Sequence, residues 1–500
     1  MRFIIEKSTL IPEPLVDKHD NNNLKRISDF DSIPRQTSNP SFEFSPELQA
    51  TLYGKQLLLE ELLFPIEVIH RHYQKGYIFY RKGIENLTCL RCGNTQLFGA
   101  FPCARCKQTF TYCRKCINMG RVSECTPLVS WGGPAPEVEI PTAPLVWKGK
   151  LSDGQQVASS ELIKAVKSDS QLLIWAVCGA GKTEILFEGM ETALLLGKRV
   201  CITTPRTDVV IELAPRIKAA FPGVEVIALY GGSEDRMKTA PITLATTHQL
   251  LRFYRAFDMV IIDEVDAFPY SVEPMLQHAV NQARKEISST IYLTATPNQQ
   301  WQKEVTSGKR KAVTIPARYH RHSLPVPRLV WCGNWEKRVK KQKLPENVVQ
   351  WIKYHLSIGK QAFLFVPKID YLEQIVDMLQ KYDSRIEGVH AEDSNRKEKV
   401  AKFRKGEIPI LVTTTILERG VTVPNIDVAV LGAEDAIFTE SALVQISGRV
   451  GRSTEYPSGE ILFFHYGRTR EMLKAIKHIE AMNKEALKRG LIEKPILVEK

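Results

Sequence analysis

The sequence lacks long apolar runs. No stretch of about 18 or more consecutive apolar residues occurs, and the run near the N-terminus, Met1 to Leu10, is too short for a secretory signal. The pattern therefore predicts no membrane span and no export, and we expect a cytoplasmic protein. Ordinary apolar content is plentiful: 43% of the 500 residues, enough for two or three domains that each bury a core.

Acidic residues are scarce relative to basic ones. The 56 Asp and Glu residues oppose 68 Lys and Arg residues, which gives a formal net charge of +12. A basic surplus favours a polyanionic partner such as nucleic acid. It does not prove one, because many basic proteins bind nothing acidic.

The ten cysteines are unevenly distributed, because six of them form three CxxC pairs: Cys89/Cys92, Cys103/Cys106 and Cys113/Cys116. In a reducing compartment such clustering predicts metal binding rather than disulfides or a redox motif. We prefer the outer two pairs as ligands, since four thiolates close a tetrahedral structural Zn²⁺ site. The middle pair, Cys103 and Cys106, replaces one outer pair, joins Cys125 at a second ion, or is free.

A phosphate-binding loop is predicted where the apolar run Leu172 to Trp175 leads into Ala176-Val-Cys-Gly-Ala-Gly-Lys-Thr183 and then into a helix-forming run. Glycines in such a loop let backbone N–H groups surround phosphate oxygens. The lysine reaches the β and γ phosphates of a nucleotide, and the threonine hydroxyl ligates Mg²⁺. Ala176 replaces the usual first glycine. The candidate nucleotide-binding residues are Ala176, Gly179, Ala180, Gly181, Lys182 and Thr183.

Carboxylates follow an apolar strand in the segment Asp258 to Asp266. A nucleotide hydrolase needs them there: Asp263 to hold Mg²⁺ and Glu264 to polarise the attacking water. Asp266 then links this site to its neighbours. An ordinary acidic loop is the alternative, and the upstream phosphate loop makes it less favoured.

Two arginines stand out further along, in Gln445-Ile-Ser-Gly-Arg-Val-Gly-Arg452. If this stretch is helical, Arg449 and Arg452 lie about one turn apart and point in a similar direction. Such guanidinium groups stabilise the charge of a transferring phosphoryl group, an effect worth on the order of 10³–10⁵ in rate. We therefore take Gln445, Arg449 and Arg452 as catalytic candidates.

Alternating strand and helix patterns predict two tandem parallel-sheet α/β domains. Strands are expected at 172–177, 199–204, 224–230, 242–246, 257–262 and 290–294, and again at 361–366, 386–390, 408–413, 426–431 and 459–465. We predict seven segments: an N-terminal arm and small helical element (1–86), a zinc module (87–128), a linker (129–147), domain 1 (148–308), a basic connector (309–345), domain 2 (346–485) and a tail (486–500). Within the arm, residues 18–46 are expected to be mobile.

The connector carries eleven Lys or Arg residues between Lys309 and Lys343 against the single acid Glu336. It is interpreted either as a solvated linker or as the lining of a polynucleotide track.

Taken together, the motifs of residues 148 to about 470 resemble superfamily 2 helicases and translocases, which implies RecA-like domains. By this resemblance Gln155 reads adenine, and several residues contact nucleic acid: Arg206, Thr246, Thr247 and His248 in domain 1, and Thr414 and Arg419 in domain 2. Thr422 stands where DEAD-box relatives carry Asp, which disfavours that subgroup. The aromatic pair Phe268 and Tyr270 either stacks on bases or packs internally.

The cysteine module ahead of these domains narrows the resemblance. With Thr111-Tyr-Cys-Arg-Lys-Cys116 and Asp263-Glu-Val-Asp-Ala-Phe-Pro-Tyr270, the chain resembles the ComFA family of late-competence proteins of Gram-positive bacteria. The resemblance implies an ATPase using ATP, Mg²⁺ and Zn²⁺, stimulated by single-stranded DNA, that helps draw transforming DNA into the cytoplasm.

The same resemblance implies a place at the inner face of the membrane, beside the uptake channel and a ComFC-type partner; a homo-oligomer is left open. Two alternatives stay open. One is a primosomal replication-restart helicase, to whose interdomain stretch Pro316-Ala-Arg-Tyr-His320 is similar. The other is an ATP-switched scaffold on single-stranded DNA that does not move.

Overall fold

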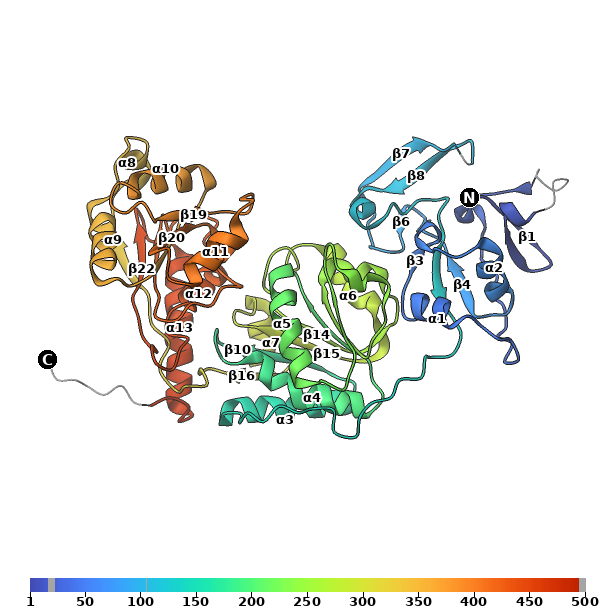
Figure 1. The fold of residues 1–500 in the computed structure, drawn as a ribbon, viewed down its shortest axis with the longest axis horizontal. Coiled ribbons are helices and arrows are strands. Elements are labelled where there is room, and N and C mark those ends of the chain that lie inside the picture. The colour runs from blue at the N-terminus through green and yellow to red at the C-terminus, as the bar shows by residue number, and fades with distance from the viewer. Residues whose placement is uncertain (17–22, 105, 494–500) are drawn as a thin grey trace. The chain divides into compact units, whose positions relative to one another are not determined.

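The structure is a computed structural model that describes residues 1–16, 23–104 and 106–493 (Figure 1). Its contacts group the chain into two compact units, one of residues 1–148, 162–172 and 187–292, the other of residues 149–161, 173–186 and 293–500. Among the described residues, no helix has the length and apolar character needed to cross a membrane. The predicted tail begins inside the last helix, α13 (Arg470–Lys488), and continues past the described residues at 494.

The N-terminal region folds around a small antiparallel sheet of strand order β3-β9-β4. It is completed by a hairpin and two helices. The bounds are β1 (Phe3–Glu6), β2 (Thr9–Pro12), α1 (Pro46–Leu52), β3 (Leu57–Leu58), α2 (Ile66–Gln74), β4 (Ile78–Arg81) and β9 (Leu128–Trp131). Because β9 pairs with both β3 and β4, the predicted linker 129–147 starts too early: its first three residues belong to this sheet.

The prediction of a mobile arm at 18–46 is wrong for residues 23–46; residues 17–22 lie outside the described part. Ile27 is fully buried, and Phe30, Phe42 and Phe44 pack on the same core. Phe44 stacks on Tyr77 with ring centroids 5.4 Å apart. The polar composition of this segment concealed four apolar anchors, each of which finds a partner only in the folded protein.

The cysteine-rich module lies in sequence between β4 and β9. It consists of two short hairpins followed by a 3₁₀ turn at Arg114–Met119: β5 (Ile84–Glu85) with β6 (Thr88–Cys89), and β7 (Phe98–Pro102) with β8 (Thr109–Cys113). With so little regular structure, the module has few apolar side chains with which to build a core, so its shape depends on what its thiols bind.

The first α/β domain contains a seven-stranded sheet of order β12-β13-β11-β14-β15-β10-β16. The predicted strands all form, and β16 is added. The bounds are β10 (Gln171–Ala176), β11 (Val200–Thr204), β12 (Val226–Leu229), β13 (Ile242–Thr246), β14 (Phe257–Ile262), β15 (Arg284–Thr294) and β16 (Ala312–Ile315).

The second α/β domain contains a six-stranded sheet of order β17-β22-β21-β18-β20-β19, in which every pair is parallel. The bounds are β17 (Arg328–Trp331), β18 (Ala362–Phe365), β19 (Glu387–Val389), β20 (Ile410–Thr413), β21 (Asp427–Leu431) and β22 (Ile461–His465). Along β18, Phe363 and Phe365 enter one buried core and Leu364 enters the other. Both faces are therefore covered, which explains the nearly continuous apolar strands.

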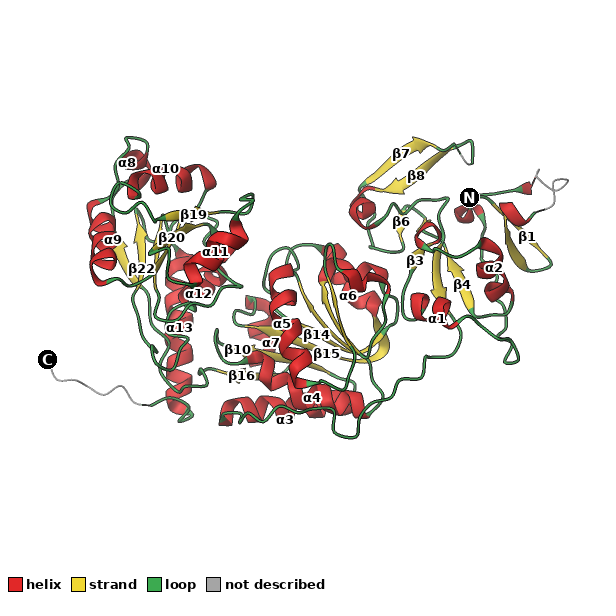
Figure 2. Cartoon of the chain, in the orientation of Figure 1, coloured by secondary structure: helices red, strands yellow, loops and turns green. Residues whose placement is uncertain are grey.

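Helices flank both sheets (Figure 2). Their bounds are α3 (Asp153–Lys167), α4 (Lys182–Leu195), α5 (Thr207–Ala220), α6 (Pro274–Ala283), α7 (Gln299–Thr306), α8 (Trp335–Val339), α9 (Glu346–Ile358), α10 (Ile369–Leu379), α11 (Arg396–Arg404), α12 (Glu440–Ser447) and α13. The predicted fold class, two parallel-sheet domains preceded by a cysteine-rich module, is confirmed.

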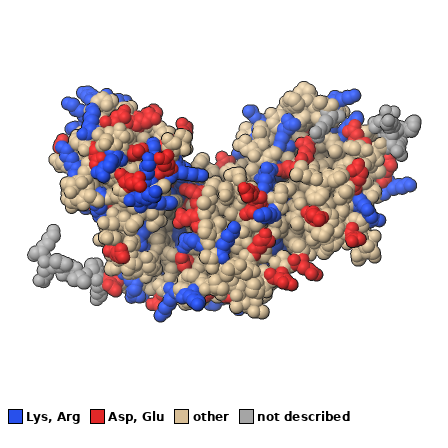
Figure 3. Space-filling view, viewed as in Figure 1, with Lys and Arg blue, Asp and Glu red and all other residues tan. Residues whose placement is uncertain are grey.

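The basic segment 309–345 is more than a solvated linker. Its strand β16 pairs with β10 in the first sheet, and its strand β17 pairs with β22 in the second. Its charge is not gathered into one field, because basic and acidic side chains are interspersed over the face drawn in Figure 3. The segment is thus part of both sheets.

Candidate functional site

The phosphate loop connects β10 to α4 as the sequence predicted. Gly179 and Gly181 adopt left-handed backbone angles, with φ of 81° and 71°. These angles are available to glycine at little cost, and they shape the turn that leads into the first residue of the helix, Lys182. A Cβ added to Gly181 would collide with the amide nitrogen of Gln155. The loop is therefore a cradle that side chains would fill, which fits a bound phosphate chain.

Gln155, the predicted adenine reader, lies against this loop. Its side chain is 4% exposed, its Nε2 donates to the carbonyl of Ala180 at 2.8 Å, and its Oε1 accepts from the amide of Ser152 at 2.8 Å. In this arrangement Gln155 braces the phosphate loop, and its contact with adenine stays a prediction.

The predicted acidic residues follow the end of β14. The amide of Asp263 donates to the carbonyl of Thr203 on the neighbouring strand β11 at 2.8 Å. The amide of Glu264 donates to Asp263 Oδ1 at 2.8 Å, and Glu264 has a φ of 54°. A left-handed non-glycine residue stores strain of about 1–3 kcal/mol, and such strain concentrates at functional sites. The roles of Asp263, Glu264 and Asp266 in hydrolysis stay predictions.

The two predicted arginines are placed differently than expected. Helix α12 ends at Ser447, so Arg449 and Arg452 do not lie on a helix. The glycines end it, since Gly451 has a φ of 70° and turns the chain. Arg449 is only 2% exposed and donates to the carbonyls of Glu418 and Val421.

Arg452 is the more accessible of the two arginines. Its Nε donates to the carbonyl of Gly448 at 2.7 Å, and its Nη1 lies 3.3 Å from the hydroxyl of Thr422. Arg449 therefore anchors the loop of residues 418–421, and Arg452 is the better candidate to face a phosphate.

An arginine that the sequence analysis did not single out as functional touches both of these motifs. Arg318 is 2% exposed, and burial lowers its pKa to about 10. Its Nε donates to the carbonyl of Cys178 in the phosphate loop at 3.0 Å, and its Nη1 donates to the carbonyl of Val450 at 2.7 Å. Beside it, the Cys178 thiol lies 3.0 Å from Gln445 Oε1. The only signal in the sequence was its place in the segment 316–320.

The predicted nucleic-acid residues divide by burial. Phe268 is 74% exposed, whereas Tyr270 is 8% exposed. The two readings of this pair therefore apply to one ring each: Phe268 is free to stack on a base, and Tyr270 packs internally. Burial raises the pKa of Tyr270 above its usual range.

The other predicted contacts are mostly covered. Thr246, Thr247 and Arg419 are buried, and Thr414 is half-buried. Arg206 pairs with Asp208 at 3.6 Å, and burial lowers the pKa of His248. Contacts of the buried threonines with a strand would have to be made by their backbone groups.

The four preferred cysteines converge. The Sγ atoms of Cys89, Cys92, Cys113 and Cys116 all lie within 4.8 Å of one another and are buried. Cys89 and Cys116 are 3.8 Å apart, and Cys92 and Cys113 are 3.5 Å apart. A tetrahedral Zn²⁺ site with Zn–S bonds of about 2.3 Å has S–S edges of about 3.8 Å, so the donor set fits Zn²⁺.

Polar groups around these thiols support the same fit. Asn94 Nδ2 lies 3.3 Å from Cys113 Sγ, and the fully buried Arg91 donates to the carbonyl of Cys116 at 3.3 Å. Donors of this kind offset the negative charge of a metal-bound tetrathiolate. The module is also fastened to α6, since Gln282 donates to the carbonyl of Leu90 at 2.7 Å.

Comparisons with known proteins agree with this picture. Three family models match: the competence protein ComFA N-terminal domain at residues 37–130, the type III restriction enzyme res subunit at 148–299, and the helicase conserved C-terminal domain at 340–454. The competence protein ComFA of Bacillus subtilis (strain 168) is 52% identical over 450 residues, covering 89% of this chain and 97% of that protein.

More distant relatives extend the likeness. ComFA of Streptococcus pneumoniae (strain ATCC BAA-255 / R6) is 39% identical, covering 81% of this chain and 92% of that protein. The ATP-dependent DNA helicase RecG of Staphylococcus epidermidis (strain ATCC 12228 / FDA PCI 1200) is 25% identical, covering 61% of this chain and 46% of that protein. Among solved structures, S. cerevisiae Dbp5 bound to RNA and ADP BeF3 matches with a TM-score of 0.50 and 14% identity, covering 70% of this chain and 100% of that chain. That last match shows the fold alone.

Proposed function

Because the chain belongs to the ComFA family of competence proteins, we propose that it is an ATP-driven motor on single-stranded DNA that draws transforming DNA into the cytoplasm. Its two helicase-type domains imply ATPase activity. The observation that carries the proposal is the phosphate loop, in which two left-handed glycines precede Lys182 at the start of α4.

We assign the nucleotide site to residues of both helicase-type domains. Lys182 and Thr183 would hold the phosphates and Mg²⁺, Asp263 would hold the same ion, and Glu264 would orient the attacking water. Bound ATP supplies the phosphoryl group, and Mg²⁺ neutralises part of its charge. Arg452 would stabilise that charge from the second domain, while Arg449 keeps the loop of residues 418–421 in place.

On the DNA side, Phe268 supports a stacking contact. It follows the acidic motif by a few residues, and its ring is exposed. A base stacked on an aromatic ring contributes about 1–3 kcal/mol without regard to sequence, which suits a protein that handles incoming DNA of any sequence. We propose that stacking on Phe268 signals to Glu264 through the short loop that joins them.

The four-thiol site supports a structural Zn²⁺ ion in the module that the ComFA N-terminal family model covers. This module touches the loop region through α6: Lys115 pairs with Glu273 at 3.2 Å, one residue before that helix begins. We further propose that the protein works at the inner face of the membrane through partner proteins, a ComFC-type protein and the uptake channel.

The ATPase rate with single-stranded DNA, duplex DNA and RNA, measured at one stated salt concentration, tests the proposal. Single-stranded DNA should stimulate hydrolysis most, and Lys182→Ala should abolish hydrolysis while keeping most of the DNA affinity. Equal rates for the parent protein and Lys182→Ala would refute the nucleotide site. Stimulation by duplex alone would instead favour a replication-restart type of helicase.

A single-molecule or bulk assay that displaces a tightly bound protein from single-stranded DNA separates a motor from a switch. Displacement should require ATP and fail with Lys182→Ala. Unchanged displacement without ATP would favour a scaffold that does not move.

A further inference from the structure

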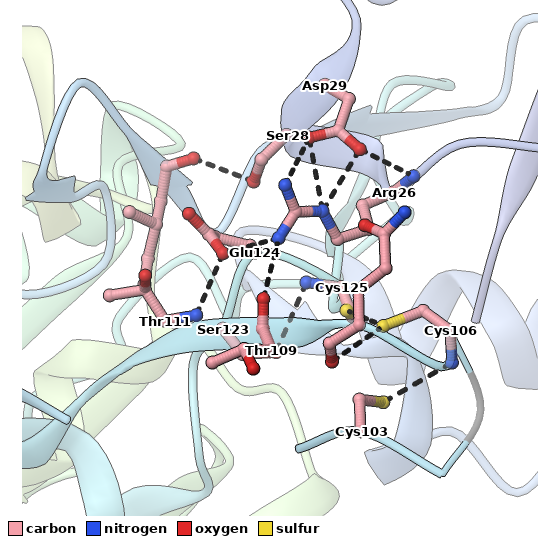
Figure 4. Close-up of polar contacts among 12 residues, drawn as sticks. Arg26, Ser28, Asp29, Cys103, Cys106, Thr109, Thr111, Ser123, Glu124 and Cys125 are labelled. Carbon is pink, nitrogen blue, oxygen red and sulfur yellow. Dashed lines mark hydrogen bonds and ion pairs between the residues drawn. The ribbon is translucent and has the colours of Figure 1, made fainter. Parts of the chain in front are cut away.

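Three further cysteines of the module converge at a second place. Cys103 and Cys106 lie in the turn between β7 and β8, and Cys125 lies in the loop before β9. Their Sγ atoms all lie within 4.8 Å of one another, and the Cys106 and Cys125 sulfurs are 3.5 Å apart (Figure 4). The third thiol thus comes from a separate segment of the chain and meets the CxxC pair only in the folded module.

The turn that holds Cys103 and Cys106 repeats the backbone of the turn that holds Cys89 and Cys92. In the first turn the amide of Cys89 donates to the carbonyl of Asn94 at 2.9 Å, and the amide of Gly93 donates to the carbonyl of Cys89 at 2.8 Å. In the second turn the corresponding bonds run from Cys103 to Gln108 at 2.9 Å and from Lys107 to Cys103 at 2.8 Å. Two loops of different sequence therefore adopt one metal-binding turn.

The second turn adopts this shape at a cost. The residue after the second cysteine is left-handed in both turns: Gly93 with a φ of 71°, and Lys107 with a φ of 58°. Glycine tolerates this angle, whereas a residue with a side chain loses about 1–2 kcal/mol. The turn also brings the amide of Cys106 to 3.5 Å from Cys103 Sγ, where it can stabilise a thiolate. A bound ion accounts for a strained turn that aims two sulfurs at a third.

We propose that Cys103, Cys106 and Cys125 bind a second Zn²⁺ ion, separate from the four-thiol site. The spacing of Cys106 and Cys125 is close to the edge of about 3.8 Å expected for a tetrahedral Zn²⁺ site. Among the described residues, no fourth ligand atom from His, Cys, Asp or Glu joins this group. Since Cys103 is half-buried while the other two are buried, the fourth position faces solvent on its side and takes a water molecule.

The ion would clamp the β7–β8 hairpin to the N-terminal region. Glu124, next to Cys125, accepts from the amide of Thr111 on β8 at 2.8 Å, and Arg26 donates to the same carboxylate oxygen at 2.8 Å (Figure 4). Arg26 also donates to the carbonyl of Thr109 at 3.3 Å. The metal and this ion pair therefore tie three segments together, near residues 26, 109 and 125.

Metal analysis of the full-length protein tests the proposal, with Cys125→Ser as the variant and Cys332→Ser as a control in which a buried cysteine far from both clusters is replaced. We expect about two Zn²⁺ ions per chain in the parent and in the control, and about one in Cys125→Ser. One ion per chain in all three proteins would overturn the proposal. So would a Cys106–Cys125 disulfide found by mass spectrometry under non-reducing conditions.

If Cys125→Ser fails to fold, the parent protein still decides the question. Metal-free parent protein is titrated with Co²⁺ while the thiolate-to-metal charge-transfer absorbance is followed. The absorbance should rise to an end point near two equivalents, with about three sevenths of the total change belonging to the three-thiolate site. An end point near one equivalent would overturn the second site and leave the four-thiol site and the proposed motor function unaffected.

Discussion

Replacing Gly181 with alanine tests whether Gln155 braces the phosphate loop. The added methyl group would have to occupy the place of Gln155 Nε2, so the amide must move away. Two hydrogen bonds would be lost, to Ala180 and Ser152, at about 1 kcal/mol each. The backbone at a φ of 71° adds about 1–2 kcal/mol.

Gly197 provides a matched control for this substitution. Its φ is 69°, and a Cβ there meets no atom within 4 Å. Gly197→Ala should therefore cost only the backbone part, about 1–2 kcal/mol, against about 3–4 kcal/mol for Gly181→Ala. For a domain of this size the difference corresponds to several degrees in melting temperature, roughly 2–4 °C per kcal/mol.

A double substitution separates the two causes. In a Gln155→Ala background the amide is absent, so Gly181→Ala should cost only the backbone part. Thermal unfolding and ADP affinity are measured for the single and double variants. If Gly181→Ala destabilises no more than Gly197→Ala, or costs the same with and without Gln155, the bracing role is refuted.

Three further predictions concern an exposed ring, a buried carboxylate and the four-thiol site. Phe268→Ala should reduce stimulation of ATP hydrolysis by single-stranded DNA about tenfold with little change in melting temperature, whereas Tyr270→Ala should lower the melting temperature because it leaves a cavity. Burial alone would raise the pKa of Asp427, but hydrogen bonds from His355, Lys360 and the amide of Glu460 outweigh it and lower the pKa. Its contribution to stability should be complete above about pH 4 and lost as pH falls below that value, so the gap in unfolding free energy between the parent and Asp427→Asn should shrink on acidification. Replacing Cys89 and Cys113 with serine should release one Zn²⁺ ion, detected by metal analysis, and destabilise the module.

Each of these has an outcome that contradicts it. Equal effects of the two aromatic substitutions on DNA stimulation would show that Phe268 does not contact the strand. A gap between the parent and Asp427→Asn that is independent of pH would show that the carboxylate is not held ionised by its partners. Unchanged zinc content after removal of Cys89 and Cys113 would exclude the four-thiol site.

Features that depend on neighbours in the sequence could be predicted without the structure. The phosphate loop is a strand, a glycine turn and a helix in immediate succession, so local geometry alone predicts it. The strands of both sheets were predictable for a related reason: they are buried on both faces and read as apolar runs. The outer four cysteines could be preferred because metal-binding spacing is a local pattern.

Other features depended on which distant segments meet. Nothing in the spacing of Arg449 and Arg452 revealed that glycines end the helix before them, or that carbonyls of residues 418 and 421 would hold one of them. The basic segment gave weak strand signals, because β16 and β17 are sheet-edge strands that owe their pairing to β10 and β22.

The amino-acid order by itself determined the local turns: where backbone amides can surround a phosphate, and where two thiols share one turn. Only the tertiary structure decided burial and partnership, such as the exposure of Phe268 beside the buried Tyr270, and the arrival of Cys125 beside Cys103 and Cys106. The physical reason is that a turn is set by the dihedral angles of a few consecutive residues. Burial and long-range contacts are set by packing, which sums over segments that lie far apart in the chain.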